Sequence, residues 1–125
     1  MNGPKLKALI ESPRLESLRE LTLGENGLPP AAMDAVLSAS WLRHLLALTV
    51  YRNGVSDAGV KALAANLPGN RLASLDLNDN DLTDGSADIL LAWPGLRQLT
   101  DLSLYPNSAM TPARMNEVAR AACEG

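Results

Sequence analysis

Cysteine and histidine, which often act as nucleophile and general base, each occur once in this 125-residue chain. Cys123 is the only cysteine and could act as a nucleophile, but the sequence places no histidine or other base to activate its thiol. His44 is the only histidine, and the residues that correspond to it in the repeat described below are polar, which indicates a solvent-exposed position. The sequence also lacks a glycine-rich phosphate-binding loop. We therefore expect a protein that is not an enzyme.

Acidic residues could instead bind a metal ion. Asp76, Asp79 and Asp101 are expected on neighbouring turns of the repeat, and the segment from Asn78 to Asp81 is rich in side-chain oxygens. Calcium takes about six to eight oxygen ligands around one point, whereas a flat surface spreads its carboxylates. We therefore expect neither a metal ion nor a cofactor.

The charge and hydropathy of the chain exclude two classes of partner. Eleven basic and 14 acidic residues give a net charge of −3 without a cluster of lysine and arginine, so we expect no nucleic acid. The longest apolar run is Ile89–Trp93, whereas a transmembrane helix needs about 20 residues, so we expect no membrane partner. The N-terminus lacks the apolar stretch of a signal peptide, and a single cysteine cannot form an intrachain disulfide. These features favour a cytoplasmic location.

A period of 27 residues runs through the chain and explains its 24 leucines, 18 alanines and lack of phenylalanine. Each period contains the pattern L-x-x-L-x-L-x-x-N-x-L, with valine in place of some leucines. Residues two apart, such as Leu21 and Leu23, point to the same face of a strand, and we expect this face to be buried. The asparagine that follows can bind backbone groups of adjacent turns. We therefore expect a structural ladder of buried asparagines, formed by Asn26, Asn53, Asn80 and Asn107.

This pattern resembles the leucine-rich repeat family, and the 27-residue period with its helical second half resembles the ribonuclease-inhibitor-like class. The resemblance implies an α/β solenoid shaped as a horseshoe arc, with a parallel β-sheet on the concave face and α-helices on the convex face. Regular, alanine-rich repeats of this type also favour a bacterial source. We expect a single domain over 1–125, with a helix-only half repeat at 1–17, full repeats at 18–44, 45–71 and 72–98, and a C-terminal repeat at 99–125.

The second half of each repeat is expected to be a helix. In the repeat at 45–71, Ser56 or Asp57 can cap the start of the helix, and Pro68-Gly69 ends it. In the last repeat, the apolar stripe returns only when one residue is inserted between Asn107 and Met110. The polar outer surface of this last helix suits a terminal, capping repeat.

The positions between the leucines of each strand face solvent and lie in register from strand to strand. They form a grid of 16 residues with five carboxylates and one arginine, which we call the strand grid. Its four rows are Glu20, Ala47, Ser74, Asp101; Thr22, Thr49, Asp76, Ser103; Gly24, Tyr51, Asn78, Tyr105; and Glu25, Arg52, Asp79, Pro106.

We expect the strand grid to bind a protein or peptide, and a basic one, because acidic side chains supply complementary charge. Tyr51 and Tyr105 are two strands apart in one row, about 10 Å at the usual strand spacing, and exposed tyrosines are efficient contact residues. The alternative is a solvent-exposed polar face that binds nothing. The expected contact residues are Glu20, Glu25, Tyr51, Arg52, Asp76, Asn78, Asp79, Asp101 and Tyr105.

Two other functions stay open. The resemblance permits a fragment of a larger regulatory protein, such as a GTPase activator or a sensor, although Arg52 is the only arginine of the strand grid. The chain could also be a scaffold with no partner of its own. The first strand, within 18–23, has no expected neighbour before it, which predicts either repeats upstream or association through this edge.

Overall fold

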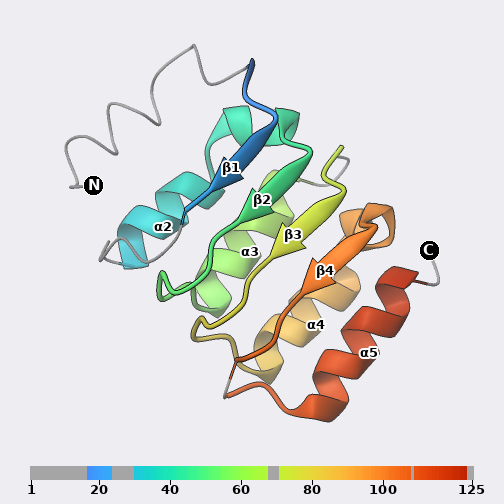
Figure 1. Ribbon diagram of the computed structural model, residues 1–125. Helices are drawn as coiled ribbons and strands as arrows, with labels where there is room; N and C mark the ends of the chain where they lie inside the picture. The colour runs from blue at the N-terminus through green and yellow to red at the C-terminus, as the bar shows by residue number, and fades with distance from the viewer. Residues whose placement is uncertain (1–16, 24–29, 68–70, 108, 124–125) are drawn as a thin grey trace.

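The computed structural model describes residues 17–23, 30–67, 71–107 and 109–123. Strands and helices alternate along these residues and form two layers (Figure 1). The half repeat expected at 1–17, except Ser17, and the expected site residues Glu25 and Asn26 lie outside the described residues. The elements are β1 (Glu20–Thr22), α2 (Pro30–Leu37), η2 (Ser40–His44), β2 (Ala47–Thr49), α3 (Asp57–Asn66), β3 (Ser74–Asp76), α4 (Asp84–Ala92), η3 (Pro94–Gln98), β4 (Asp101–Ser103) and α5 (Pro112–Cys123), where η marks a 3₁₀ helix.

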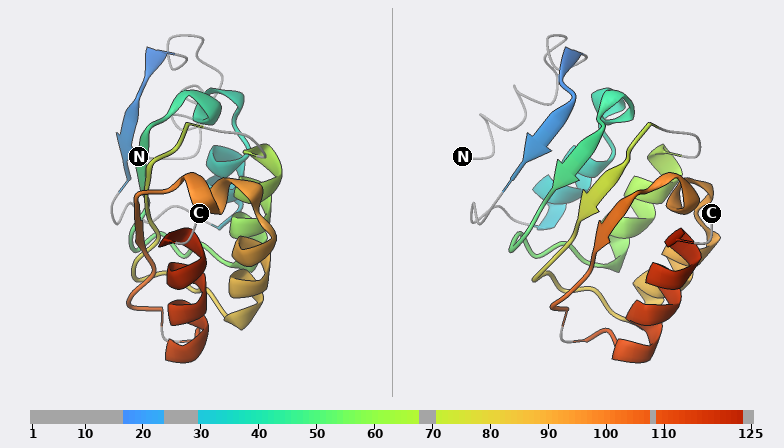
Figure 2. Two further views of the ribbon diagram at one scale, coloured as in Figure 1. Left: turned by 90° about the vertical axis from the view of Figure 1, so that its right-hand side faces the viewer. Right: turned by 45° about the vertical axis from the view of Figure 1, so that its right-hand side comes forward.

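The four strands form one parallel sheet in the order β1-β2-β3-β4. Leu21 pairs with Leu48, Leu48 with Leu75, and Leu75 with Leu102, so each strand is shifted by one period from its neighbour. Figure 2 shows the helices on one face of the sheet, and within the described residues the opposite face carries none. This arrangement confirms the predicted α/β repeat fold with a parallel sheet.

Leucine side chains fill the space between the two layers. Leu48 and Leu75 from the strands and Leu63 and Leu90 from α3 and α4 are at most 1% exposed. Burial of one such side chain contributes roughly 1.5–3 kcal/mol of transfer free energy. Because the same positions recur in every period, each turn is stabilised mainly by contact with the turns beside it.

Asparagine side chains connect neighbouring turns at the ends of the strands. Asn80 Oδ1 accepts hydrogen bonds from the backbone N–H groups of Asn53 and Val55, at 3.0 and 3.1 Å, and Asn80 Nδ2 donates to the carbonyl of Val50 at 2.8 Å. Asn107 makes the same three bonds one repeat later. A buried N–H group without an acceptor costs about 1–3 kcal/mol, so these side chains fix the alignment of one turn on the next.

A carboxylate at the start of one helix binds the start of the next helix. Asp57 accepts hydrogen bonds from the backbone N–H of Thr83 at 3.0 Å and from the hydroxyl groups of Thr83 and Ser86. Thr83 in turn caps α4, because its hydroxyl oxygen accepts the N–H of Gly85 at 3.1 Å. Burial raises the pKa of Asp57, but the hydrogen bonds from Ser86 and Thr83 together bring it below its ordinary value. We call Asp57, Thr83 and Ser86 the Asp57 cluster.

The same contact recurs between α4 and α5 with a different spacing. Asp84 accepts the backbone N–H of Thr111 at 2.8 Å and also its hydroxyl. Asp57 and Thr83 are 26 residues apart, whereas Asp84 and Thr111 are 27 apart. The last repeat thus has one additional residue between these contacts, which supports the insertion that the sequence pattern requires before Met110.

Candidate functional site

The open face of the sheet carries the first two rows of the strand grid. Strand pairing aligns Glu20, Ala47, Ser74 and Asp101 in one row, and Thr22, Thr49, Asp76 and Ser103 in the next. Glu20 and Asp101 are exposed at the two ends of their row, and Asp76 is half-buried. The carboxylates of these rows are therefore spread over the sheet rather than gathered at one point.

The two tyrosines lie in the turns that follow β2 and β4. The exposed fraction is 41% for Tyr51 and 74% for Tyr105, and only Leu46 is a comparably exposed large apolar residue among those described. Asn78 stands between the two tyrosines in the row and is half-buried. Its Oδ1 accepts the hydroxyl of Ser103 at 2.7 Å, and its backbone N–H donates to Asp76 Oδ1 at 2.9 Å. Asn78 and Asp76 therefore have structural bonds that would have to be kept or exchanged on binding.

Arg52 and Asp79 of the last row form an ion pair with each other. Arg52 Nε lies 2.5 Å from Asp79 Oδ2, and the two side chains are 58% and 46% exposed. Two of the expected contact residues thus neutralise each other on the surface. The uncompensated charge of the described grid comes from Glu20, Asp76 and Asp101.

The backbone after the last strand takes a different path from the turns before it. Arg52 and Asp79, one period apart, both adopt left-handed φ values of 54° and 58°, which are uncommon for residues other than glycine. Pro106 holds the corresponding position in the last repeat, and its ring restricts φ to negative values. The change in backbone path therefore occurs beside Tyr105, which is the most exposed large apolar residue in the described part of the chain.

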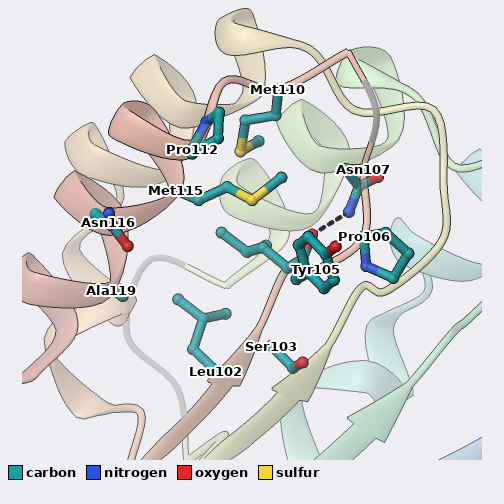
Figure 3. A pocket seen from close by; sticks show the side chains of 11 residues that line it. Leu102, Ser103, Tyr105, Pro106, Asn107, Met110, Pro112, Met115, Asn116 and Ala119 are labelled. Atoms are coloured by element: carbon teal, nitrogen blue, oxygen red, sulfur yellow. Dashed lines mark hydrogen bonds between the residues drawn. The ribbon is translucent and has the colours of Figure 1, made fainter.

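A pocket opens next to this turn, between β4 and α5 (Figure 3). It has a volume of about 560 Å³. We call it the β4–α5 pocket. Its walls come from Leu102, Ser103, Leu104, Tyr105, Pro106, Asn107, Met110, Pro112, Met115, Asn116 and Ala119.

The side chains that close this pocket are mostly apolar. Leu102 points from β4 and Met115 from α5 into the space between the two elements, as Figure 3 shows, and Met110 lies at its far wall. Asn107 Nδ2 is already bound to the carbonyl of Leu104 at 2.5 Å. The pocket therefore suits apolar side chains better than a polar or charged ligand.

Sequence reasoning did not predict this pocket. The apolar stripe of the last repeat, restored by the insertion before Met110, implied a covered core. Met110 is buried, but Met115 of α5 is only partly buried. The position of Leu102 in the repeat could have indicated the pocket. Leu102 is the last of the four leucines in register, and no further strand pairs with β4 in the described residues. Only Tyr105 is shared by the pocket and the list of expected contact residues.

The described residues include no group of three His, Cys, Asp or Glu that could hold a metal ion. His44 is exposed at the end of η2. Among the described residues, none of the helices is both long and apolar enough to span a membrane.

Comparison with known proteins finds a repeat family that matches two segments of the chain and a solved structure of similar fold. Residues 42–64 and 72–88 match the family described as Leucine Rich repeat. No curated protein matches the sequence. Among solved structures, the chain is similar to leiomodin-1 actin-binding site 2, with a TM-score of 0.64 and 16% sequence identity, over 94% of this chain and 70% of that chain. The two matched segments fall in consecutive repeats, and the structural likeness extends the same fold over nearly the whole chain.

Proposed function

We propose that this chain of leucine-rich repeats is a non-catalytic module that binds a protein or peptide on its strand grid. The observation that carries the proposal is the exposure of Tyr51 and Tyr105 in the turns that follow β2 and β4, next to a sheet face that no described helix covers. A tyrosine combines a large apolar ring with a hydroxyl group, and it loses little conformational entropy when it is fixed in an interface. Two such exposed rings, two repeats apart, are suited to contact with a partner.

The charge of the strand grid favours a basic partner. Glu20, Asp76 and Asp101 have no ion-pair partner among the described residues, whereas Arg52 is paired with Asp79. Exposed charges of this kind affect mainly the rate of encounter and the choice of partner, and contribute little to affinity. The pairing of Arg52 also gives no support to a GTPase-activating role, since that side chain is already bound to a carboxylate.

The structural comparison supports a protein as the partner. By its name, the similar region of leiomodin-1 is an actin-binding site. We propose for the present chain only the general function, protein binding, together with the concave curvature and the ribonuclease-inhibitor-like class that the 27-residue period suggests.

Affinity capture followed by binding measurements tests the proposal. A protein captured by the chain would be identified, purified and titrated against the wild type and the Tyr51→Ala/Tyr105→Ala double variant. We expect the double variant to bind at least about tenfold more weakly, because tyrosine anchors dominate interfaces of this type. Leu46→Ala is the matched control, since Leu46 is 44% exposed but lies outside the strand grid.

The result that would overturn the proposal is a captured partner whose affinity is the same for the wild type and the double variant, with both proteins folded by circular dichroism. Equal loss of affinity in the Leu46→Ala variant would also contradict it, because binding would then not depend on the strand grid.

A further inference from the structure

We propose that the outer edge of β4 and the β4–α5 pocket bind an extended segment of a partner protein. The segment would add a fifth parallel strand and place two apolar side chains, two residues apart, in the pocket. This site is separate from the centre of the strand grid and does not depend on the function proposed for it.

The first evidence is a series of backbone N–H groups. In each of the first three repeats, the N–H of the apolar residue that follows the strand donates to a carbonyl of the next strand. The next residue of this series is Leu104, and its N–H donates to no group within the described residues. The three existing bonds are Leu23 to Thr49 at 2.7 Å, Val50 to Asp76 at 3.0 Å, and Leu77 to Ser103 at 2.9 Å.

A series of carbonyl groups shows the same pattern at the start of the strands. The carbonyls of Arg19, Leu46 and Ala73 each accept two N–H groups from the next turn, at distances of 2.6–3.2 Å. The next residue of this series is Thr100, whose carbonyl accepts no hydrogen bond within the described residues. The edge of β4 thus presents an acceptor and a donor in the positions that bind a following strand elsewhere in the chain, as in binding by strand addition.

The burial of the strand leucines provides independent evidence. Leu48 and Leu75 are 0% and 1% exposed, whereas Leu102, in register with both, is only partly buried. The difference arises because a following turn covers the first two leucines and none covers Leu102 in the described residues. Met110 and Met115 line the space that remains, and unbranched methionine side chains adapt to apolar groups of different shape.

The internal turns indicate which segment fits. At each of the three internal strand contacts, the occupant is an extended segment with apolar residues at alternate positions, such as Leu48 and Val50. Side chains at alternate positions point to one face of a strand. A segment bound at β4 would therefore direct two apolar side chains into the pocket and the residues between them to the open face.

Charge decides between a second copy of this chain and a different protein. In the register of the sheet, the first residue of an added strand lies beside Asp101, which is exposed. The β1 strand of a second copy would place Glu20 there, and like charges directly opposite each other destabilise a strand pair. A lysine or arginine at that position would form a favourable pair. We therefore expect a partner segment of the form basic–apolar–any–apolar, supplied by another protein.

Titration of isotope-labelled protein with a synthetic peptide tests the proposal. The peptide S-K-L-T-L-S, blocked at both ends, should shift the amide signal of Leu104 and the methyl signals of Met110 and Met115. Replacement of its lysine by glutamate should weaken binding several-fold. The Asp101→Lys variant should instead bind the glutamate peptide more tightly than the lysine peptide. This variant should fold, because Asp101 is exposed.

Two further variants separate this site from the strand grid. Ala119→Phe places a ring at the exposed rim of the pocket and should weaken peptide binding at least about tenfold. Tyr51→Ala, on the strand grid but outside the pocket, should leave it unchanged. The proposal is overturned by the absence of shifts at saturating peptide or by shifts confined to residues around Tyr51. It is also overturned if the lysine peptide binds Asp101→Lys and Ala119→Phe as tightly as it binds the wild type. Concentration-dependent dimerisation with shifts at Leu104 would overturn it in favour of a second copy.

Discussion

The side-chain oxygen of Asn80 accepts a hydrogen bond of 3.0 Å from the backbone N–H of Asn53, which occupies the equivalent position one repeat earlier. The same oxygen also accepts the N–H of Val55 at 3.1 Å. One side chain thus satisfies two backbone groups of the neighbouring turn in a part of the molecule from which water is excluded. This contact links the asparagine of the repeat pattern directly to the stacking of the turns.

Asn80→Ala is expected to reduce the free energy of unfolding by about 3–5 kcal/mol. The substitution leaves two buried N–H groups without acceptors, each costing about 1–3 kcal/mol, and it also removes the Nδ2 amide, whose two hydrogens are shared among three backbone carbonyls. Urea denaturation measures the loss. The matched control is Asn78→Ala, because Asn78 is half-buried and its side chain accepts a single hydrogen bond, from Ser103. A loss in Asn80→Ala no larger than in the control would contradict the structural role of the ladder.

The regular part of the fold could be predicted because one residue type fills each position in every turn. The register Leu21–Leu48–Leu75–Leu102 follows from a period of 27 residues, since each strand must bury the same face as its neighbour. The solvent-facing rows follow from the same alternation. The identity of the residues in the core thus carries the information on strand order and register.

Contacts at the ends of the helices could not be predicted from the period, because different residue types make them. Asn66 and Trp93 are 27 residues apart. Asn66 Nδ2 donates to the carbonyls of Leu37 and Ala39, at 3.1 and 2.9 Å, and Trp93 Nε1 donates to the carbonyl of Leu67 at 2.6 Å. Both side chains donate to carbonyl groups of the preceding turn. Their equivalence is not visible in the sequence pattern, because one is an amide and the other an indole.

The candidate site was predicted only in part, for a similar reason. Alternation within the strands indicates that Tyr51 and Tyr105 face solvent, but not that Arg52 is bound to Asp79, since that depends on side-chain conformation. The β4–α5 pocket depends on whether a neighbour covers Leu102. A pattern of apolar residues gives the chemical type of a side chain and not the space left beside it.

Trp93→Phe is expected to lower stability by roughly 1–2 kcal/mol. Trp93 is 3% exposed, so the substitution removes a buried hydrogen bond from Nε1 to the carbonyl of Leu67 and also leaves a small void. Thermal unfolding followed by circular dichroism measures the change. Trp93→Leu serves as a comparison, because it removes the same bond and more volume, and should be more destabilising than Trp93→Phe. Unchanged stability in both variants would show that this bond and the packing around it contribute nothing.

The Asp57 cluster makes part of the stability dependent on pH. The hydrogen bonds to Asp57 lower the pKa of its carboxyl in the folded protein below the ordinary value of 3.8. The charged carboxylate therefore stabilises the fold above about pH 4, and this contribution is lost as the pH falls through the lower, folded-state pKa. Relative to the wild type, Asp57→Asn should be less stable by about 1–2 kcal/mol at neutral pH, with a smaller difference in more acidic solution.

The pH dependence is measured by urea denaturation of both proteins between neutral pH and the acid limit of folding. Thr83→Val removes the hydroxyl that donates to Asp57 and should behave similarly to Asp57→Asn, whereas Thr83→Ser retains a hydroxyl and should remain close to the wild type. A stability difference between wild type and Asp57→Asn that stays constant over this pH range would contradict the lowered pKa.

Gly85→Ala tests the geometry of the Asp57 cluster, because its effect on the free energy of unfolding should differ in sign with and without the Asp57 carboxylate. Alanine in a helix is normally more favourable than glycine by up to about 1 kcal/mol. A Cβ atom at Gly85, however, would lie 2.9 Å from Asp57 Oδ2 and 3.3 Å from Thr83 Oγ1. The carboxylate would have to move and weaken its hydrogen bonds, so we expect Gly85→Ala to destabilise the wild type. In the Asp57→Ala background this contact is absent, and the same substitution should become neutral or stabilising. A double-mutant cycle of unfolding free energies measures the difference, and additive effects of the two substitutions would exclude the contact between Gly85 and the Asp57 carboxylate.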